Sequence, residues 1–365
     1  MNVAQPPRRL GAYDIVAKIA GGGMATIYLG RQRDPSGLQH VAAIKVIKQE
    51  LAEQDEFVQM FMDEAKILSL LHHPNVSSAL EHGVTDNQRF IVMELLLGRT
   101  LLDVWQACSN RELPFDLDLA AWIGGRVAYG LHHAHELYDE AGQPLALIHR
   151  DVTPSNVFLT YDGEVKLFDF GLAKTQGRRH ATRAGVVKGK VSYFSPEQVD
   201  MLPLDRRSDI YTLGVTLWEL TTMSRLFQRD TDLEAVFAIR AGLVPDPREI
   251  IDGYPDELWR IVAKALHHDR DARYSTADEL ADDLDRFVAA GADPADSPMP
   301  QRIVDLLVDL FPGERERQAG WLTQTSALGR SAAGPTMPPP APILPMPEGG
   351  PESVRPPRPP ALPRG

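Results

Sequence analysis

The chain has 365 residues, of which 43% are hydrophobic and 24% charged, a composition typical of a protein with a globular core. Its 38 Lys and Arg residues against 50 Asp and Glu residues give a formal net charge of −12. This charge argues against a general nucleic-acid-binding surface, because such surfaces are basic. The single cysteine, Cys108, excludes an intramolecular disulfide and fits a reducing compartment.

The N-terminal stretch MNVAQPPRRL lacks the apolar segment of a signal peptide. The chain also lacks a run of about 18 consecutive apolar residues, so we expect no membrane span. These two features predict a cytoplasmic protein whose contact with membranes, if any, would pass through partners.

The first 95 residues are expected to form a mostly antiparallel sheet with one helix. Strands are expected in YDIVAKIA, in the stretch that follows the glycine run, and in HVAAIKVIK. The period then changes to three or four over 54–71, which indicates an amphipathic helix that ends before His73-Pro-Asn75. Two more strands are expected around 76–82 and 89–95.

The rest of the chain is expected to be mainly helical, with helices near 100–108, 116–138, 196–200, 208–223, 231–241, 255–267 and 276–290. Short strands are expected at 157–159 and 165–168. A sheet-rich lobe joined to a larger helical lobe is an α+β arrangement. Beyond about 290, residues 302–311 predict one short amphipathic helix. From Pro335 onward, 13 of 31 residues are proline, which predicts a disordered tail with polyproline II character.

Two features of the first lobe are suited to binding phosphates. In I19-A-G-G-G-M-A-T-I27, glycines at a turn between strands allow backbone N–H groups to approach a phosphate, although most such turns are only turns. Lys45 lies on a strand between apolar neighbours, so it needs a buried partner. Glu64, among the apolar residues of the helix, is the candidate, although a surface glutamate is the simpler interpretation of that residue alone.

Two further motifs supply acids and an amide. H149-R-D-V-T-P-S-N156 carries Asp151 and Asn156, and D169-F-G171 follows a predicted strand. Oxygen ligands of this kind suit Mg²⁺ and nucleotide chemistry. Each motif alone could be incidental, but their joint order is very specific: glycine turn, strand lysine, helix glutamate, HRD…N, DFG and SPE.

This set resembles the protein kinase family, and specifically bacterial serine/threonine kinases of the eukaryotic type. The resemblance implies a two-lobed kinase fold over 13–288, with an N-lobe of 13–95 and a C-lobe of 96–288. We expect an N-terminal extension over 1–12, a linker with a short helix over 289–333, and a proline-rich disordered tail over 334–365.

The resemblance also implies an ATP site. The loop over the phosphates would comprise Ile19, Ala20, Gly21, Gly22, Gly23, Met24, Ala25, Thr26 and Ile27. The usual first and third glycines of this loop are here Ala20 and Ala25, which predicts a stiffer lid. Lys45 would hold the α- and β-phosphates and pair with Glu64. The adenine pocket would be lined by Ile27, Ala43, Met93 and Phe158, with backbone bonds from Glu94 and Leu96.

In the same way, Asp151 matches the catalytic base, and Asn156 and Asp169 match the Mg²⁺ ligands. Asp209 would brace the backbone of the catalytic loop at His149. Glu197 and Arg273 would form a buried ion pair in the large lobe. ATP and Mg²⁺ are therefore the expected cofactors.

Thr153 departs from the pattern, because serine/threonine kinases usually carry a lysine there. The chain instead has Lys190 where the family usually has a threonine that bonds the catalytic aspartate and lysine. We hypothesise a reciprocal exchange in which Lys190 supplies the cation that position 153 lacks and Thr153 forms a hydrogen bond near Asp151. The alternative is that Lys190 is a solvated loop residue.

Arg150 precedes Asp151, a pairing that in this family often marks control by phosphorylation of the activation loop. Thr182 is the better candidate for autophosphorylation and Thr175 the second, with an unmodified loop as the alternative. Transient homodimers would support such a reaction in trans.

The resulting prediction is ATP- and Mg²⁺-dependent phosphorylation of Ser and Thr residues in protein substrates. The alternative is a pseudokinase scaffold that binds nucleotide or partners without turnover. The proline-rich tail is either an adaptor-binding segment or an unselected disordered end. No nucleic-acid partner is expected.

Overall fold

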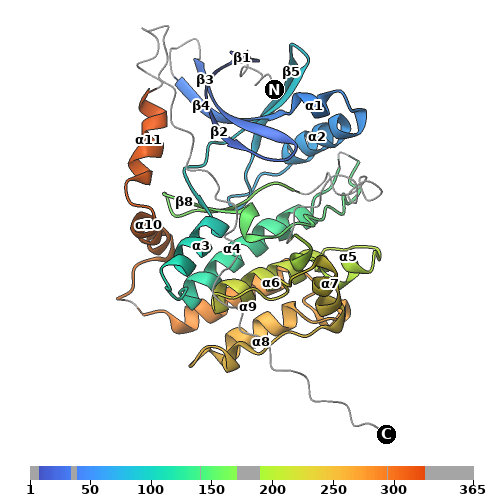
Figure 1. Ribbon diagram of the computed structural model, residues 1–365, viewed down its shortest axis with the longest axis vertical. Helices are drawn as coiled ribbons and strands as arrows, with labels where there is room; N and C mark the ends of the chain where they lie inside the picture. Colours follow the sequence, from blue (N-terminus) through green and yellow to red (C-terminus); the bar gives the residue numbers. More distant parts are fainter. Residues whose placement is uncertain (1–7, 34–38, 140, 171–189, 294, 325–365) are drawn as a thin grey trace.

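The computed structural model describes residues 8–33, 39–139, 141–170, 190–293 and 295–324. A sheet-rich small lobe lies above a larger helical lobe (Figure 1). This arrangement confirms the predicted two-lobed α+β fold. Thr175 and Thr182, and the proline-rich segment from Pro335, lie outside the described residues.

The small lobe is built on one antiparallel sheet. Its strands are β1 (Arg9–Leu10), β2 (Tyr13–Gly21), β3 (Ala25–Arg33), β4 (Gln39–Ile47), β5 (Ala79–Thr85) and β6 (Gln88–Met93). Their spatial order is β1-β2-β3-β4-β6-β5. Two helices, α1 (Gln49–Ala52) and α2 (Asp55–Leu68), connect β4 to β5. The short α1 and β1 were not expected from the sequence.

The two faces of this sheet carry separate apolar clusters, because side chains alternate along each strand. Ile44 and Val46 of β4 join the cluster that contains Leu10 and Phe90. Ile47 instead packs with Phe61 and Ala65 of α2. Lys45 therefore lies on the α2 face of β4, where its register partner is Ile91, a member of the same cluster as Ile47.

The helix of the small lobe ends earlier than its apolar period suggests. Leu70 and Leu71 donate their backbone N–H groups to Ile67 and Leu68, three residues back, so the chain leaves α2 in tight turns. Leu71 is still fully buried. The apolar period thus continues to residue 71 because the core continues, although the α-helix itself stops at Leu68.

The large lobe consists mainly of helices, which follow the predicted ranges closely. They are α3 (Leu101–Asn110), α4 (Leu117–His135), α5 (Pro196–Val199), α6 (Arg207–Thr222), α7 (Asp232–Ala241), α8 (Asp256–Ala265) and α9 (Ala277–Gly291). The predicted helix over 116–138 is shorter at its end, because Tyr138 pairs with Pro144 in an isolated β-bridge. Thr100 and Asp103 form a reciprocal capping box at the start of α3.

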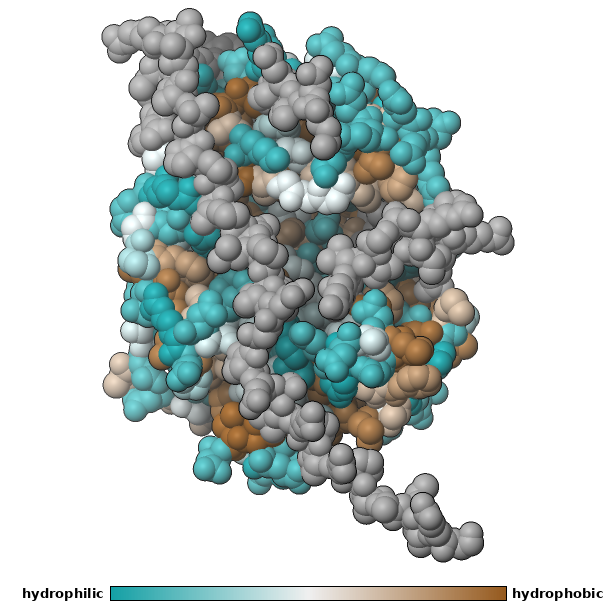
Figure 2. Space-filling view, in the orientation of Figure 1, coloured by the Kyte–Doolittle hydropathy of each residue, from teal (hydrophilic) through white to brown (hydrophobic). Residues whose placement is uncertain are grey.

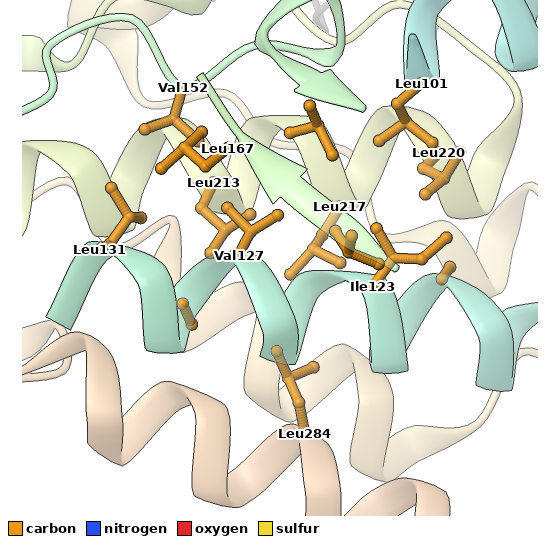
Figure 3. Packing of buried hydrophobic residues seen from close by; sticks show 14 of the residues in the cluster. Leu101, Ile123, Val127, Leu131, Val152, Leu167, Leu213, Leu217, Leu220 and Leu284 are labelled. Carbon is orange, nitrogen blue, oxygen red and sulfur yellow. The ribbon is translucent and has the colours of Figure 1, made fainter. Parts of the chain in front are cut away.

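The core of the large lobe lies between α4 and α6. Figure 3 shows Ile123, Val127 and Leu131 of α4 directed toward Leu213 and Leu217 of α6. Leu284 of α9 approaches α4 from the other side, so α4 is covered on both flanks (Figure 3). This packing makes α4 the central helix of the lobe.

A small sheet joins this core to the region between the lobes. Its strands are β7 (Gly98–Thr100), β8 (Val157–Thr160) and β9 (Val165–Leu167), in that order. Val76, expected at the start of a strand of the small lobe, instead forms a parallel bridge with Leu167 of β9. The predicted strand around 76–82 therefore begins three residues later, at Ala79.

Two helices follow α9 where the sequence predicts one. They are α10 (Met299–Leu310) and α11 (Glu314–Gln324), which runs along the side of the molecule (Figure 1). Ile303, Leu307 and Leu310 are buried members of the large-lobe core. The α10 helix is therefore an integral part of this lobe.

On the face shown in Figure 2, hydrophilic residues alternate with scattered hydrophobic groups. Across the residues that the structure describes, no helix combines the length and the apolar character needed to cross a membrane. Cys108 is buried in α3, and burial raises the pKa of its thiol, which disfavours the reactive thiolate.

Candidate active site

Three charged side chains meet where the small lobe faces the large lobe. The Lys45 ammonium group lies 2.6 Å from Glu64 Oε1 and 2.9 Å from Asp169 Oδ1. These residues come from β4, from α2 and from the segment after β9. The predicted Lys45–Glu64 pair is therefore present, and it brings with it the aspartate of the DFG motif.

The electrostatics of this triad follow from burial and from the sharing of one cation. Burial alone would lower the pKa of Lys45, but the Asp169 and Glu64 carboxylates raise it above its ordinary value. Lys45 in turn lowers the pKa of Asp169. Burial raises the pKa of Glu64, against the opposing effect of Lys45. Lys45 is thus firmly cationic and held in position between two acids.

The loop from His149 to Asn156 is fixed from below by Asp209 of α6. The Asp209 carboxylate accepts hydrogen bonds from the backbone N–H groups of His149, at 2.8 Å, and Arg150, at 2.7 Å. Arg150 has a φ of +68°, a costly conformation for a residue with a side chain, and these two bonds help to hold it there. The buried His135 shares the same carboxylate at 2.8 Å, a support that the sequence motifs did not indicate.

His149 orients the loop through both of its ring nitrogens. Its Nε2 lies 3.2 Å from the Phe168 carbonyl oxygen and must carry the proton, whereas Nδ1 accepts from the Asp151 backbone N–H at 3.3 Å. Burial lowers the pKa of His149, in agreement with a neutral ring. The ring also packs against Phe170, with 4.5 Å between centroids, which links the HRD and DFG motifs.

The oxygen donors present are compatible with a magnesium ion. Asn156 donates from Nδ2 to the Asp151 carbonyl oxygen at 2.8 Å. The amide oxygen of Asn156 is therefore directed away from that carbonyl oxygen. Asp169 uses Oδ1 for Lys45, and half of its side chain is exposed. Within the described part of the chain, no group of three or more His, Cys, Asp or Glu side chains could hold a metal. Two protein ligands fit Mg²⁺, which commonly completes its shell with water and phosphate oxygens.

Thr153 is buried inside the catalytic loop. Its hydroxyl lies 2.8 Å from that of Ser155, directly before the short 3₁₀ helix η1 (Pro154–Asn156). Lys190 begins the 3₁₀ helix η4 (Lys190–Tyr193), which leads into the SPE motif. Its side chain lies outside what the structure describes, so the proposed exchange with Thr153 stays a prediction.

The residues expected to face the nucleotide lie on three segments. Ile19, Ala20 and Gly21 end β2, Gly22–Met24 form the turn, and Ala25, Thr26 and Ile27 open β3. Gly22 donates its N–H to the Ala25 carbonyl oxygen at 2.9 Å, which closes the hairpin. Strand register places Ile27 opposite Lys45 and Ala43 opposite Met93.

The chain between β6 and β7 connects the two lobes and carries the residues expected to contact adenine. Glu94 and Leu96 lie in this linker, and Phe158 lies on β8 of the large lobe. The Glu94 carboxylate accepts from the Ser78 backbone N–H at 2.9 Å and pairs with Lys166 at 3.3 Å. Sequence motifs did not indicate Lys166, because a lysine on a short strand is normally solvated.

The large lobe contains the predicted buried ion pair. Arg273 donates from its two terminal nitrogens to the two oxygens of Glu197, at 2.7 and 3.0 Å. Ser208 of α6 adds a hydrogen bond to Glu197 at 2.7 Å. Gln198, the next residue of α5, donates to the Arg150 carbonyl oxygen at 3.1 Å. The SPE segment therefore connects directly to the catalytic loop.

A two-lobed fold with this lysine, glutamate, aspartate and asparagine set defines a protein kinase. The family described as the protein kinase domain matches residues 13–284, and the chain belongs to that family. It matches the tyrosine-protein kinase MasK of Myxococcus xanthus with 40% identity over 279 residues, which is 76% of this chain and 43% of MasK. It matches the serine/threonine-protein kinase PrkC of Bacillus subtilis with 31% identity, over 75% of this chain and 40% of PrkC.

Other relatives agree with this assignment. The serine/threonine-protein kinase PknL of Mycobacterium tuberculosis is 34% identical, over 75% of this chain and 65% of PknL. The crystal structure of the Mycobacterium tuberculosis PknI kinase domain matches with a TM-score of 0.56 and 24% identity, over 76% of this chain and 97% of that domain, which shows a shared fold. The match to the protein kinase domain and the relatives with 31–40% identity confirm the predicted family, bacterial kinases of the eukaryotic type. The chain spans less than half the length of MasK and PrkC.

Proposed function

We propose that the protein transfers the γ-phosphate of ATP, with Mg²⁺, to Ser or Thr hydroxyls of proteins. The observation that carries this proposal is the Lys45 ammonium group, held 2.6 Å from Glu64 and 2.9 Å from Asp169. Phosphoryl transfer depends on the positioning of the phosphates and on the stabilisation of their charge. The Lys45–Glu64–Asp169 triad is suited to both tasks.

Each residue has a distinct task in this proposal. Lys45 binds the α- and β-phosphates, and Glu64 keeps Lys45 in place. Asp151 accepts the proton of the substrate hydroxyl. Asn156 and Asp169 would hold Mg²⁺, which, when bound, neutralises charge on the β- and γ-phosphates. The backbone of Glu94 and Leu96 would bind adenine.

The choice of Ser and Thr as acceptors rests on the catalytic loop. One relative carries the name tyrosine-protein kinase and others carry the name serine/threonine-protein kinase. H149-R-D-V-T-P-S-N156 has Pro154, as in the loops of serine/threonine kinases, at the first position of η1. We therefore favour hydroxyls of Ser and Thr over the phenol of Tyr.

The direct test is incubation of the protein with radiolabelled ATP, Mg²⁺ and casein, followed by acid hydrolysis and separation of the phosphoamino acids. We expect labelled phosphoserine and phosphothreonine. Label confined to phosphotyrosine would overturn the acceptor assignment. Complete absence of label, with nucleotide still bound, would favour the pseudokinase alternative.

We further propose autophosphorylation of Thr182, or secondarily Thr175, in transient homodimers. Arg150 would grip the new phosphate, because a guanidinium can bind phosphate through two hydrogen bonds. Mass spectrometry of the same incubated protein should find phosphate at Thr182. An active enzyme without phosphate on either threonine would contradict this regulatory proposal while leaving the transfer activity intact.

The exchange between positions 153 and 190 concerns the positive charge that stabilises the transferring phosphate in the transition state. Thr153 cannot supply a positive charge to the transferring phosphate, and Lys190 opens the segment that precedes SPE. We expect Lys190→Ala to lower kcat by at least about tenfold, because a removed cation no longer stabilises developing charge. Steady-state kinetics would check this, with Lys66→Ala, an exposed lysine on α2, as the control. Full turnover in Lys190→Met would refute the exchange.

A further inference from the structure

The α11 helix is attached to the rest of the protein through polar side chains. Over its first two turns, Glu314 and Gln318 are the buried residues, with exposed fractions of 9% and 5%. A helix that packs only for stability usually buries an apolar stripe. Buried polar groups must be hydrogen-bonded to avoid a desolvation cost, so these two residues mark a specific contact.

Gln318 binds both backbone groups of a single residue, Gly98. Its Oε1 accepts from the Gly98 N–H at 2.8 Å, and its Nε2 donates to the Gly98 carbonyl oxygen at 3.1 Å. Gly98 is the first residue after the 94–97 linker between the lobes. A Cβ at this position would overlap the Leu159 carbonyl oxygen, so the chain is pressed against β8 on one side and held by Gln318.

Glu314, one turn earlier on α11, orients the Gln318 amide. Its Oε1 accepts from Gln318 Nε2 at 2.7 Å and lies 3.1 Å from Arg99, the neighbour of Gly98. The Arg99 guanidinium also stacks over the Phe311 ring, 4.8 Å from its centroid. The start of β7 is therefore held by several contacts from the segment that follows α10.

The opposite end of the linker is also fixed. The Glu94 carboxylate binds the Ser78 backbone in the small lobe and Lys166 in the large lobe. The linker is thus anchored at Glu94 and at Gly98, with Leu96 between them. Such anchoring lowers the ordering cost that a ligand pays when it binds the linker backbone.

We propose that Gln318 is a positioning residue for the nucleotide site: it fixes the Gly98 end of the linker and so presents the backbone of Glu94 and Leu96 to adenine. The ligand in this inference rests on the proposed function, whereas the contact itself rests on the distances above. Figure 1 shows α11 beside the junction of the two lobes, where such a role is expected.

The test compares Gln318→Leu, which keeps the side-chain size but loses both hydrogen bonds, with Gln301→Leu on α10. Gln301 contacts Asp305 at the surface and serves as the matched control. We expect Gln318→Leu to raise the KM for ATP by about five- to tenfold while kcat stays nearly unchanged, because a linker without both Gln318 bonds must be ordered by the nucleotide, at a cost comparable to the net free energy of about one hydrogen bond. The control should leave both constants unaltered.

Hydrogen–deuterium exchange provides a readout that does not need activity. Backbone amides over 94–98 should exchange faster in Gln318→Leu than in the wild type or in Gln301→Leu, without nucleotide. Unchanged exchange together with an unchanged KM would overturn the inference. A lower kcat and a lower thermal stability, with no change in KM, would also overturn it. If the wild type transfers no phosphate, the proposed function fails, and exchange still decides whether Gln318 holds the linker.

Discussion

Arg273 illustrates how a single residue joins stability to the site. Its guanidinium binds both oxygens of Glu197, stacks over the Tyr211 ring at 4.7 Å, and donates to the carbonyl oxygens of Arg207, His267 and His268. The pKa of Glu197 is subject to burial, which would raise it, but hydrogen bonds and charge from Arg273 bring it below its ordinary value. The pair therefore favours the folded state when Glu197 is charged.

We predict that Arg273→Ala lowers the free energy of unfolding by about 3–5 kcal/mol at pH 7.5, because Glu197 is left buried without its partner. Urea denaturation measures this loss. Arg270, whose side chain is 41% exposed and which pairs with Asp205 at 3.6 Å, offers a matched control. Arg270→Ala should change the free energy of unfolding by less than about 1 kcal/mol.

The same pair predicts a dependence on pH. Because the folded-state pKa of Glu197 is lowered, its contribution is complete above the unfolded-state pKa and is lost as pH falls through the folded-state value. In Arg273→Ala, the Glu197 carboxyl is buried without a partner, so its folded-state pKa is raised. A lower pH therefore stabilises the folded state of this variant. The gap between wild type and Arg273→Ala in the free energy of unfolding should therefore narrow from pH 7.5 to pH 5. An equal gap at both values would contradict this account of the pair.

At the scale of elements, the α10 helix shows how the region after α9 contributes to the fold. Leu307 is fully buried in the large-lobe core, whereas its neighbour Val308 is 45% exposed. We predict that Leu307→Ala lowers the free energy of unfolding by about 2–5 kcal/mol, through lost burial and a residual cavity. Val308→Ala should change it by less than about 0.5 kcal/mol. If urea denaturation gives an equally small change in the free energy of unfolding for both variants, α10 is not integral to the fold.

Elements with a clear period could be predicted from the sequence. Alternation along β4 placed Lys45 between apolar neighbours. The apolar repeat of α2 placed Glu64 among the apolar residues of that helix. The three-residue β7 was missed because it is too short to show a period. The α11 helix was missed because its buried residues are Glu314 and Gln318, which resemble a polar surface in sequence.

Much of the candidate site could also be predicted, because its residues occur in motifs with a fixed order. Lys45, Glu64 and Asp169 were named from these motifs, and the structure brings them together. The supports supplied by His135 and Lys166 could not be predicted in this way. Their partners lie far along the chain, so only the folded structure shows these contacts.

At the scale of the whole molecule, the described parts of the two lobes are joined by apolar packing, in which Leu68, Leu71 and Val76 belong to the large-lobe core, and by polar contacts. Lys45 of the small lobe reaches Asp169, and Val76 bridges to Leu167 of β9. The linker is anchored by Glu94 at one end and by Gly98 at the other. These contacts fix β4, which carries Lys45, relative to the DFG segment and to the linker.

We propose that this site transfers phosphate with Asp151 as the base. The most direct measurement is single-turnover transfer from ATP to a protein substrate, comparing wild type with Asp151→Asn and with Asp162→Asn, an exposed control in the turn after β8. We predict that Asp151→Asn lowers the rate by about 10²–10⁴-fold with nucleotide affinity retained, and that the control reacts like wild type. A wild-type rate in Asp151→Asn, or no transfer by the wild type, would contradict the account.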